Sequence, residues 1–128
     1  MKGILPRQAI RQLIDTPAVD AAAGILNDQL QPASLDLRLG PVAHRIRASF
    51  LPAEGERIAA KVDSVLLHTI DLSAGAVLET GCVYLVPLQE RLALPEGVAA
   101  STNPKSSTGR LDVFTRVIAD GAGGFDFA

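Results

Sequence analysis

Residues 34–39 alternate strictly between apolar and polar side chains, reading Ser-Leu-Asp-Leu-Arg-Leu. Because successive side chains of a strand point to opposite faces, this alternation predicts a half-buried strand. Its inward-facing side chains are expected to be Leu35, Leu37 and Leu39. Asp36 and Arg38 share the other face, where they either remain a solvated polar surface or pair, with each other or with a loop. The following Gly40-Pro41 predicts a turn.

Further short apolar segments follow along the chain, each bounded by Gly, Pro or polar turn residues. They cover residues 42–50, 68–72, 81–88, 98–100 and 113–118. Helical patterns are fewer. One amphipathic helix is predicted over about residues 6–15, residues 57–67 are ambiguous with a helical period, and residues 104–110 predict a tight turn with room for one helical turn. Since regular strand–helix alternation is absent, we expect a mainly β fold, a barrel or sandwich with one or two short helices.

The composition favours one small domain over residues 1–128. The chain is 48% hydrophobic but only 4% aromatic, so its core is expected to consist of Ala, Val, Ile and Leu. A formal net charge of −2 excludes a generic basic nucleic-acid binder, while it leaves room for a local cationic pocket. Cys82 is the only cysteine, so no internal disulfide framework is possible. Neither a signal peptide nor an apolar run of about 18 residues occurs, and we expect a soluble cytoplasmic protein.

Residues 103–110 read Asn-Pro-Lys-Ser-Ser-Thr-Gly-Arg and carry the strongest indication of a binding site. Ser and Thr at a helix start present hydroxyls beside unsatisfied backbone N–H groups, an arrangement that attracts anions. Lys105 and Arg110 flank these hydroxyls with positive charge, and Arg can hold a phosphate through two hydrogen bonds. The alternative is an ordinary capped turn at the surface. The glycine spacing of a Walker loop is absent.

Other catalytic constellations have less support. His44, His68 and Cys82 have neither the spacing nor the partner cysteine of a zinc deaminase, so no metal ligands are expected. Composition alone leaves a Ser-His-Asp hydrolase open, yet no Gly-x-Ser-x-Gly elbow is present and neither histidine has a recognisable catalytic context. These three residues are more simply interpreted as core or surface positions.

Two segments carry a family resemblance. Residues 31–40, Gln-Pro-Ala-Ser-Leu-Asp-Leu-Arg-Leu-Gly, look like the first motif of dCTP deaminases, which are relatives of the dUTPases. Residues 104–111, Pro-Lys-Ser-Ser-Thr-Gly-Arg-Leu, look like their phosphate motif, with matching order and separation. The turn at 92–95 and the run at 117–120 match as well. The chain is most similar to the N-terminal half of the long bacterial form, in which two dUTPase-like halves share one chain.

This resemblance implies a β-clip or distorted jelly-roll domain of the dUTPase-like superfamily. It also implies a trimer-like homo-oligomer with nucleotide sites between neighbouring units. The family reaction is hydrolysis of the 4-amino group of dCTP, which yields dUTP and ammonia. The implied partners are dCTP, dUTP or dTTP-type nucleotides, with Mg²⁺ carried on the triphosphate and no zinc. Neither nucleic acid nor a membrane is an expected partner.

The resemblance also implies roles for individual residues. Lys105, Ser106, Ser107 and Arg110 would bind the triphosphate, with Ser106 and Arg110 also supporting catalysis. The base pocket would be lined by Val117, Ile118 and Ala119. Asp36 and Arg38 would brace the site rather than react.

Two departures from the family pattern bear on activity. Residues 120–125 stand where compact members have an Arg and an Ile-Asp-Pro-Gly loop. The family's general base is a Glu on the next strand, whereas Glu96 is the last glutamate here. Metal-free deamination needs a base that takes a proton from water and passes it to the departing amine. We therefore expect a domain that is incomplete at its C-terminus and has little deaminase activity by itself.

Two alternatives stay open at the level of sequence. The chain could be a non-catalytic nucleotide-binding or assembly module on the same fold. It could also be a dUTP pyrophosphatase, which hydrolyses the link between the α and β phosphates with a carboxylate-activated water. Asp120 or Asp126 would then be the candidate base, although neither lies in a convincing Ile-Asp motif.

Overall fold

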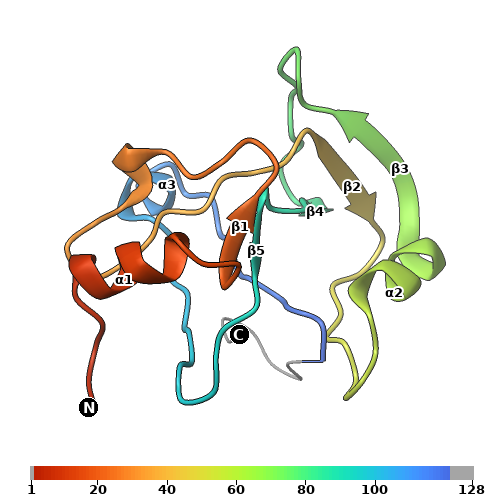
Figure 1. The fold of residues 1–128 in the computed structure, drawn as a ribbon. Helices are drawn as coiled ribbons and strands as arrows, with labels where there is room; N and C mark the ends of the chain where they lie inside the picture. Colours follow the sequence, from red (N-terminus) through yellow and green to blue (C-terminus); the bar gives the residue numbers. More distant parts are fainter. Residues whose placement is uncertain (1, 122–128) are drawn as a thin grey trace.

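Two small antiparallel sheets and several short helices make up the fold (Figure 1). The computed structural model describes residues 2–121. In chain order the elements are α1 (Arg7–Ile14), β1 (Val19–Ala21), the 3-10 helix η1 (Asn27–Gln29), β2 (Val42–Ile46), α2 (Ile58–Val65), β3 (Leu66–Asp71), β4 (Val83–Leu85), β5 (Glu90–Leu92) and α3 (Ser106–Gly109). The expected mainly β class is confirmed, although the described residues form three α-helices rather than one or two.

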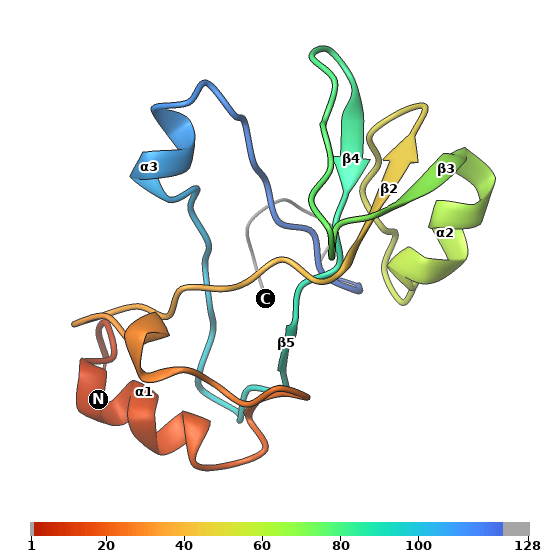
Figure 2. The ribbon, with the colours of Figure 1, turned by 90° about the horizontal axis from the view of Figure 1, so that it is seen from above.

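The two sheets are built around different strands. β2 is the central strand of the larger sheet and pairs antiparallel with both β3 and β4. β1 and β5 form the second sheet, with Val19 opposite Leu92. A long irregular connection then runs from β5 to α3, which lies at the end of the molecule away from α2 in both views (Figures 1 and 2).

α1 fixes the loop that leads into the first motif. The helix begins directly after Pro6, and it lies within the range that the amphipathic pattern predicts. The guanidinium of Arg7 donates to the carbonyl of Leu30. Nη2 of Arg11 donates to Oδ1 of Asn27 at 2.6 Å. These bonds tie both ends of the η1 region to one helix, and Gln29 at the end of η1 bonds to Glu90 at the start of β5.

The core is small and aliphatic, as the low aromatic content predicts. Its buried apolar residues are Ala18, Val19, Ala21, Leu30, Ala43, Ile46 and Val62. Two polar residues, Gln29 and Glu90, are buried beside them. Because a buried polar group is costly unless it is hydrogen-bonded, these two residues must have specific partners. Gln29 and Glu90 bond to each other and to residues 36 and 38 of the first motif.

The predicted strand over residues 34–39 does not form, which corrects the interpretation of the alternating pattern. The segment is extended but makes only two isolated bridges, Leu30 with Leu35 and Leu39 with Leu88. It changes partner along its length, so neither pairing is long enough for a ladder. Leu39, predicted to face inward, is 58% exposed.

The turn after this segment requires glycine. The backbone N–H of Gly40 donates to the carbonyl of Pro87 at 2.7 Å. A Cβ at Gly40 would lie 2.6 Å from that same oxygen, well inside van der Waals contact. The close approach therefore holds the end of the first motif against the residues that precede β5.

β3 covers residues 68–71 of the predicted segment 68–72, whereas the remaining strand predictions were too long or wrong. The apolar runs at 42–50 and 81–88 contain β2 and β4, which cover only part of each. The ambiguous segment 57–67 forms α2 and the start of β3. No strand forms over 98–100 or 113–118 within residues 2–121. A segment with strand propensity forms a strand only where a neighbouring strand edge pairs with its backbone N–H and C=O groups. In the described part of the chain, residues 98–100 and 113–118 belong to no such strand ladder.

Candidate functional site

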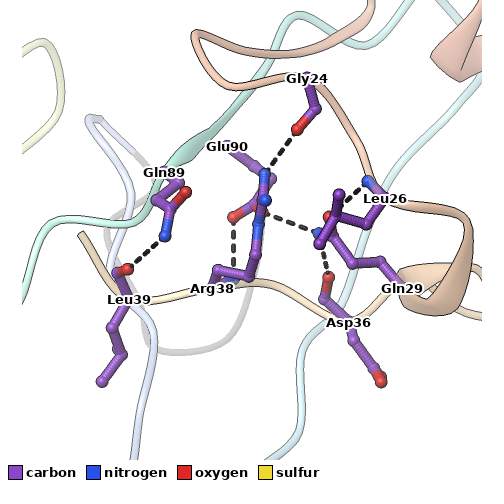
Figure 3. Close-up of polar contacts among 8 residues, drawn as sticks. All are labelled: Gly24, Leu26, Gln29, Asp36, Arg38, Leu39, Gln89 and Glu90. Carbon is purple, nitrogen blue, oxygen red and sulfur yellow. Dashed lines mark hydrogen bonds and ion pairs between the residues drawn. The ribbon is translucent and has the colours of Figure 1, made fainter.

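Glu90 is a buried carboxylate at the start of β5, with 1% of its side chain exposed. Its Oε1 accepts from Nε of Arg38 and from Nε2 of Gln29, each at 2.8 Å, and its Oε2 accepts from the backbone N of Arg38 at 2.9 Å (Figure 3). Burial raises the pKa of Glu90, but the hydrogen bonds from Arg38 and Gln29 outweigh it and hold that pKa below its ordinary value of 4.5. Glu90 is therefore an ionised, fully partnered group at neutral pH.

Gln29 connects Glu90 to the first motif. Its Nε2 donates to the carbonyl of Asp36 at 2.9 Å as well as to Glu90, and its Oε1 accepts from the backbone N of Leu26 at 2.8 Å (Figure 3). The backbone N of Asp36 donates to the carbonyl of Gln29 at 2.8 Å. Gln29 thus holds the backbone of Asp36 at both its N–H and its C=O.

Asp36 and Lys105 bring the two predicted motifs together. Nζ of Lys105 lies 2.5 Å from Oδ2 of Asp36, although the residues are 69 positions apart. Nε2 of Gln31 donates to the same oxygen at 3.2 Å. The Lys105 side chain is 63% exposed, so its ammonium also faces solvent. Asp36 is therefore the residue of the first motif that contacts the phosphate motif.

Arg38 faces the other way, although it lies only two residues from Asp36. Its guanidinium pairs with Glu90, and its Nη2 donates to the carbonyl of Gly24 at 2.6 Å (Figure 3). Of the alternatives left open for these two charges, pairing with other segments is the one observed, because Asp36 pairs with Lys105 and Arg38 pairs with Glu90. Arg38 secures the backbone of the first motif to β5 and to the loop after β1.

The phosphate motif forms α3, a helix of only four residues that follows Lys105. Ser106, Ser107 and Arg110 are exposed, and no side chain caps the start of the helix. A helix this short contributes little dipole, so an anion here would depend on the hydroxyls and on the two cationic side chains. The predicted triphosphate residues therefore lie close together in the chain and accessible to a ligand.

The predicted base-pocket residues Val117, Ile118 and Ala119 are half-buried in an extended segment. Asp120 anchors the end of that segment, because its Oδ1 accepts from the backbone N of Ile58 at 2.7 Å. Its carboxylate therefore caps the start of α2. Asp126, the other carboxylate considered as a base, lies outside the described residues.

A groove of about 570 Å³ opens beside Gly40 and is lined largely by Leu39, Pro41, Pro87 and Leu88. Its lining includes neither the phosphate motif nor residues 117–119. Over residues 2–121, no three His, Cys, Asp or Glu side chains gather closely enough to hold a metal ion. None of the helices in this part of the chain is long and apolar enough to cross a membrane.

Comparison with known proteins identifies the family. The model of the 2'-deoxycytidine 5'-triphosphate deaminase N-terminal domain matches residues 1–128. The chain belongs to the dCTP deaminase family. Two curated relatives are 30% identical over 92 residues, which cover 71% of this chain: dCTP deaminase of Haloarcula marismortui and the dUMP-forming dCTP deaminase of Methanothermobacter thermautotrophicus. This chain spans about half the length of each, 47% and 46% respectively.

A solved dCTP deaminase also has this fold. The crystal structure of 2'-deoxycytidine 5'-triphosphate deaminase from Agrobacterium tumefaciens superposes with a TM-score of 0.93 and is 58% identical. The match covers 98% of this chain and 38% of the Agrobacterium chain. The family resemblance and the dUTPase-like fold that the two motifs predicted are therefore confirmed.

Sequence reasoning missed Gln29 and Glu90. The sequence does contain a signal for Glu90, namely a charged residue next to an apolar segment. Arg38 is a residue of opposite charge within a leucine-rich segment. Opposite charges in two apolar segments indicate a buried pair, since a charge is rarely buried alone. Gln29 lies in a polar loop, and nothing in the sequence marks it as buried.

Proposed function

We propose that this chain is the nucleotide-binding N-terminal domain of a dCTP deaminase, whose whole protein hydrolyses dCTP to dUTP and ammonia. The observation that carries the proposal is the contact between Asp36 and Lys105. It joins the two motifs of the resemblance at one end of the molecule, which the sequence alone could not place there. The family membership and the likeness to a solved dCTP deaminase support the same conclusion.

In this proposal the triphosphate binds at α3. Lys105 and Arg110 supply positive charge, and the hydroxyls of Ser106 and Ser107 donate to phosphate oxygens. Val117, Ile118 and Ala119 would contact the base. Local cations are sufficient for this role even in a chain of net charge −2, because a polyanion responds to the charges that lie closest to it.

The residues at α3 also fit Mg²⁺ that arrives on the nucleotide. The donors there are an ammonium, a guanidinium and hydroxyls, which suit phosphate oxygens, and the nearby Asp36 carboxylate is already paired with Lys105. Mg²⁺ keeps several waters and commonly binds through substrate phosphates rather than through a protein cage. When bound, it would neutralise part of the phosphate charge.

Hydrolysis additionally needs a base that removes a proton from the attacking water and delivers it to the leaving ammonia. The carboxylates at the motifs have other partners: Asp36 pairs with Lys105, and Glu90 accepts from three donors. Asp120 caps α2, which disfavours the pyrophosphatase alternative as well. We therefore expect the 128-residue chain to bind dCTP and to release ammonia very slowly.

Calorimetric titration of the purified chain with dCTP and Mg²⁺ tests the binding proposal. Ser106→Ala and Arg110→Ala should each weaken binding by about tenfold, the scale for losing a hydrogen bond to a charged group. Ser64→Ala and Arg57→Ala remove the same side chains from the exposed surface of the α2 region and should leave binding unchanged. Absence of binding by the unaltered chain would refute the proposal.

A second candidate is an assembly role on the same fold, which the surface after α3 favours. Leu111 and Phe114 are 77% and 84% exposed. Large exposed apolar side chains close in sequence are typical of protein interfaces. Sedimentation equilibrium would detect a trimer-like homo-oligomer, and Phe114→Ser should then weaken it. An assembled chain that binds no dCTP would favour the assembly role alone.

A further inference from the structure

We propose that Glu90 is a positioning residue for the triphosphate site and that it acts through Gln29 and Asp36 on Lys105. The inference rests on the proposed function, because it assumes that Lys105 binds phosphate. It adds two residues that neither motif contains. The path is short: Glu90 to Gln29, Gln29 to the backbone of Asp36, and the Asp36 carboxylate to Lys105.

The first step is the orientation of the Gln29 amide. A carboxylate can only accept hydrogen bonds, so ionised Glu90 requires the NH₂ end of Gln29 to face it. That orientation places the same NH₂ group on the carbonyl of Asp36 and leaves Oε1 to accept from Leu26. Both N–H donors of the amide are used, its oxygen accepts from Leu26, and the residue is 5% exposed. Glu90 therefore selects one of the two amide orientations.

The second step is the backbone of the first motif. Gln29 binds Asp36 through both its main chain and its side chain, at 2.8 and 2.9 Å. Glu90 binds the backbone N of Arg38 two residues later. Residues 36–38 are consequently fixed by one buried carboxylate and one buried amide rather than by a strand ladder. The direction of the Asp36 side chain follows from this backbone.

The third step is the placement of Lys105. A lysine side chain is long and flexible, and this one is mostly exposed, so few contacts limit where its ammonium lies. The 2.5 Å contact between Nζ of Lys105 and Oδ2 of Asp36 limits where the ammonium lies. Outer-shell partners of this kind commonly change affinity by about 10- to 100-fold in metal sites. A comparable effect on a phosphate-binding lysine is expected here.

A double-mutant cycle on the 128-residue chain tests the inference, with dCTP plus Mg²⁺ as the probe. Glu90→Gln and Lys105→Ala should each weaken binding by about tenfold, and the double variant should lose about tenfold rather than about 100-fold. Losses of dCTP affinity that pass through the same contact do not add. If Glu90 affected binding only by stabilising the fold, its loss of affinity would add to that of Lys105. Glu79→Gln is the matched control, because Glu79 pairs with Arg45 at 2.8 Å on the other sheet and is 62% exposed.

If Glu90→Gln unfolds the chain, as judged by circular dichroism, Gln29→Met replaces it in the cycle. That variant removes the amide and leaves the ion pair between Arg38 and Glu90 in place. Additive losses with Lys105→Ala, or no loss from the Glu90 and Gln29 variants, would overturn the inference while leaving the proposed function intact. If the unaltered chain does not bind dCTP, the proposed function fails and the inference fails with it.

Discussion

Replacement of Glu90 by alanine should destabilise the fold far more than replacement of an exposed carboxylate. The change removes one partner of a buried ion pair and the acceptor for three donors from Arg38 and Gln29. Removing one partner of a buried pair costs about 3–5 kcal/mol. The guanidinium of Arg38 keeps its bond to Gly24, and Gln29 keeps its bond to Asp36, so the lower end of that range applies.

Urea denaturation followed by far-ultraviolet circular dichroism measures this loss. With a slope of about 1.5 kcal/mol/M for a small domain, a loss of about 3 kcal/mol lowers the urea midpoint by about 2 M. Glu79→Ala is the control, since an exposed ion pair contributes only about 0–1 kcal/mol. Equal midpoints for the two variants would refute the argument that Glu90 is a buried and indispensable partner.

Three further predictions concern stability. Gly40→Ala should lower the free energy of unfolding by about 2–4 kcal/mol, because the new Cβ would clash with the Pro87 carbonyl and disturb its hydrogen bond with the residue 40 N–H. Urea midpoints measure this loss, and a loss below about 1 kcal/mol would contradict the prediction. Because the pKa of Glu90 is lowered, its ion pair stabilises the fold fully above pH 4.5, and this contribution disappears as pH falls through the lowered pKa. Between pH 7 and pH 3 the urea midpoint should therefore decline less in Glu90→Gln than in the unaltered chain. Asp120→Ala should cost about 1 kcal/mol through loss of the bond to the Ile58 N–H, and an unchanged midpoint would refute its capping role.

The sequence was most informative where local patterns decide the outcome. The amphipathic segment after Pro6 and the Ser-rich turn of α3 depend on neighbouring residues, and both lie where their patterns placed them. The alternation at 34–39 predicted a strand that does not form, because the backbone of this segment binds two separate segments instead of one continuous strand edge. No local pattern specifies which distant segment a strand meets.

The candidate site divides in the same way. Its exposed donors, Lys105 among them, belong to a recognisable motif, whereas the buried residues that organise it do not. Gln29 resembles any loop glutamine until its partner 61 positions away is known. The contact of Asp36 with Lys105 likewise depends on the whole chain between them. The sequence therefore identified Asp36 and Arg38 as bracing residues but missed Gln29 and Glu90, which bind them.

The long separations between these partners have a consequence for how the domain forms during synthesis. Gln29 and Glu90 are 61 positions apart, Asp36 and Lys105 are 69 apart, and Ile58 and Asp120 are 62 apart. Non-local contacts slow folding because the intervening chain must first lose its freedom. A nascent chain can secure the first motif only after residue 90 has left the ribosome, and can join it to the phosphate motif only after residue 105. Until then Arg38 lacks its counter-charge, and the segments that will form the core stay exposed, which is the condition in which incompletely folded chains aggregate.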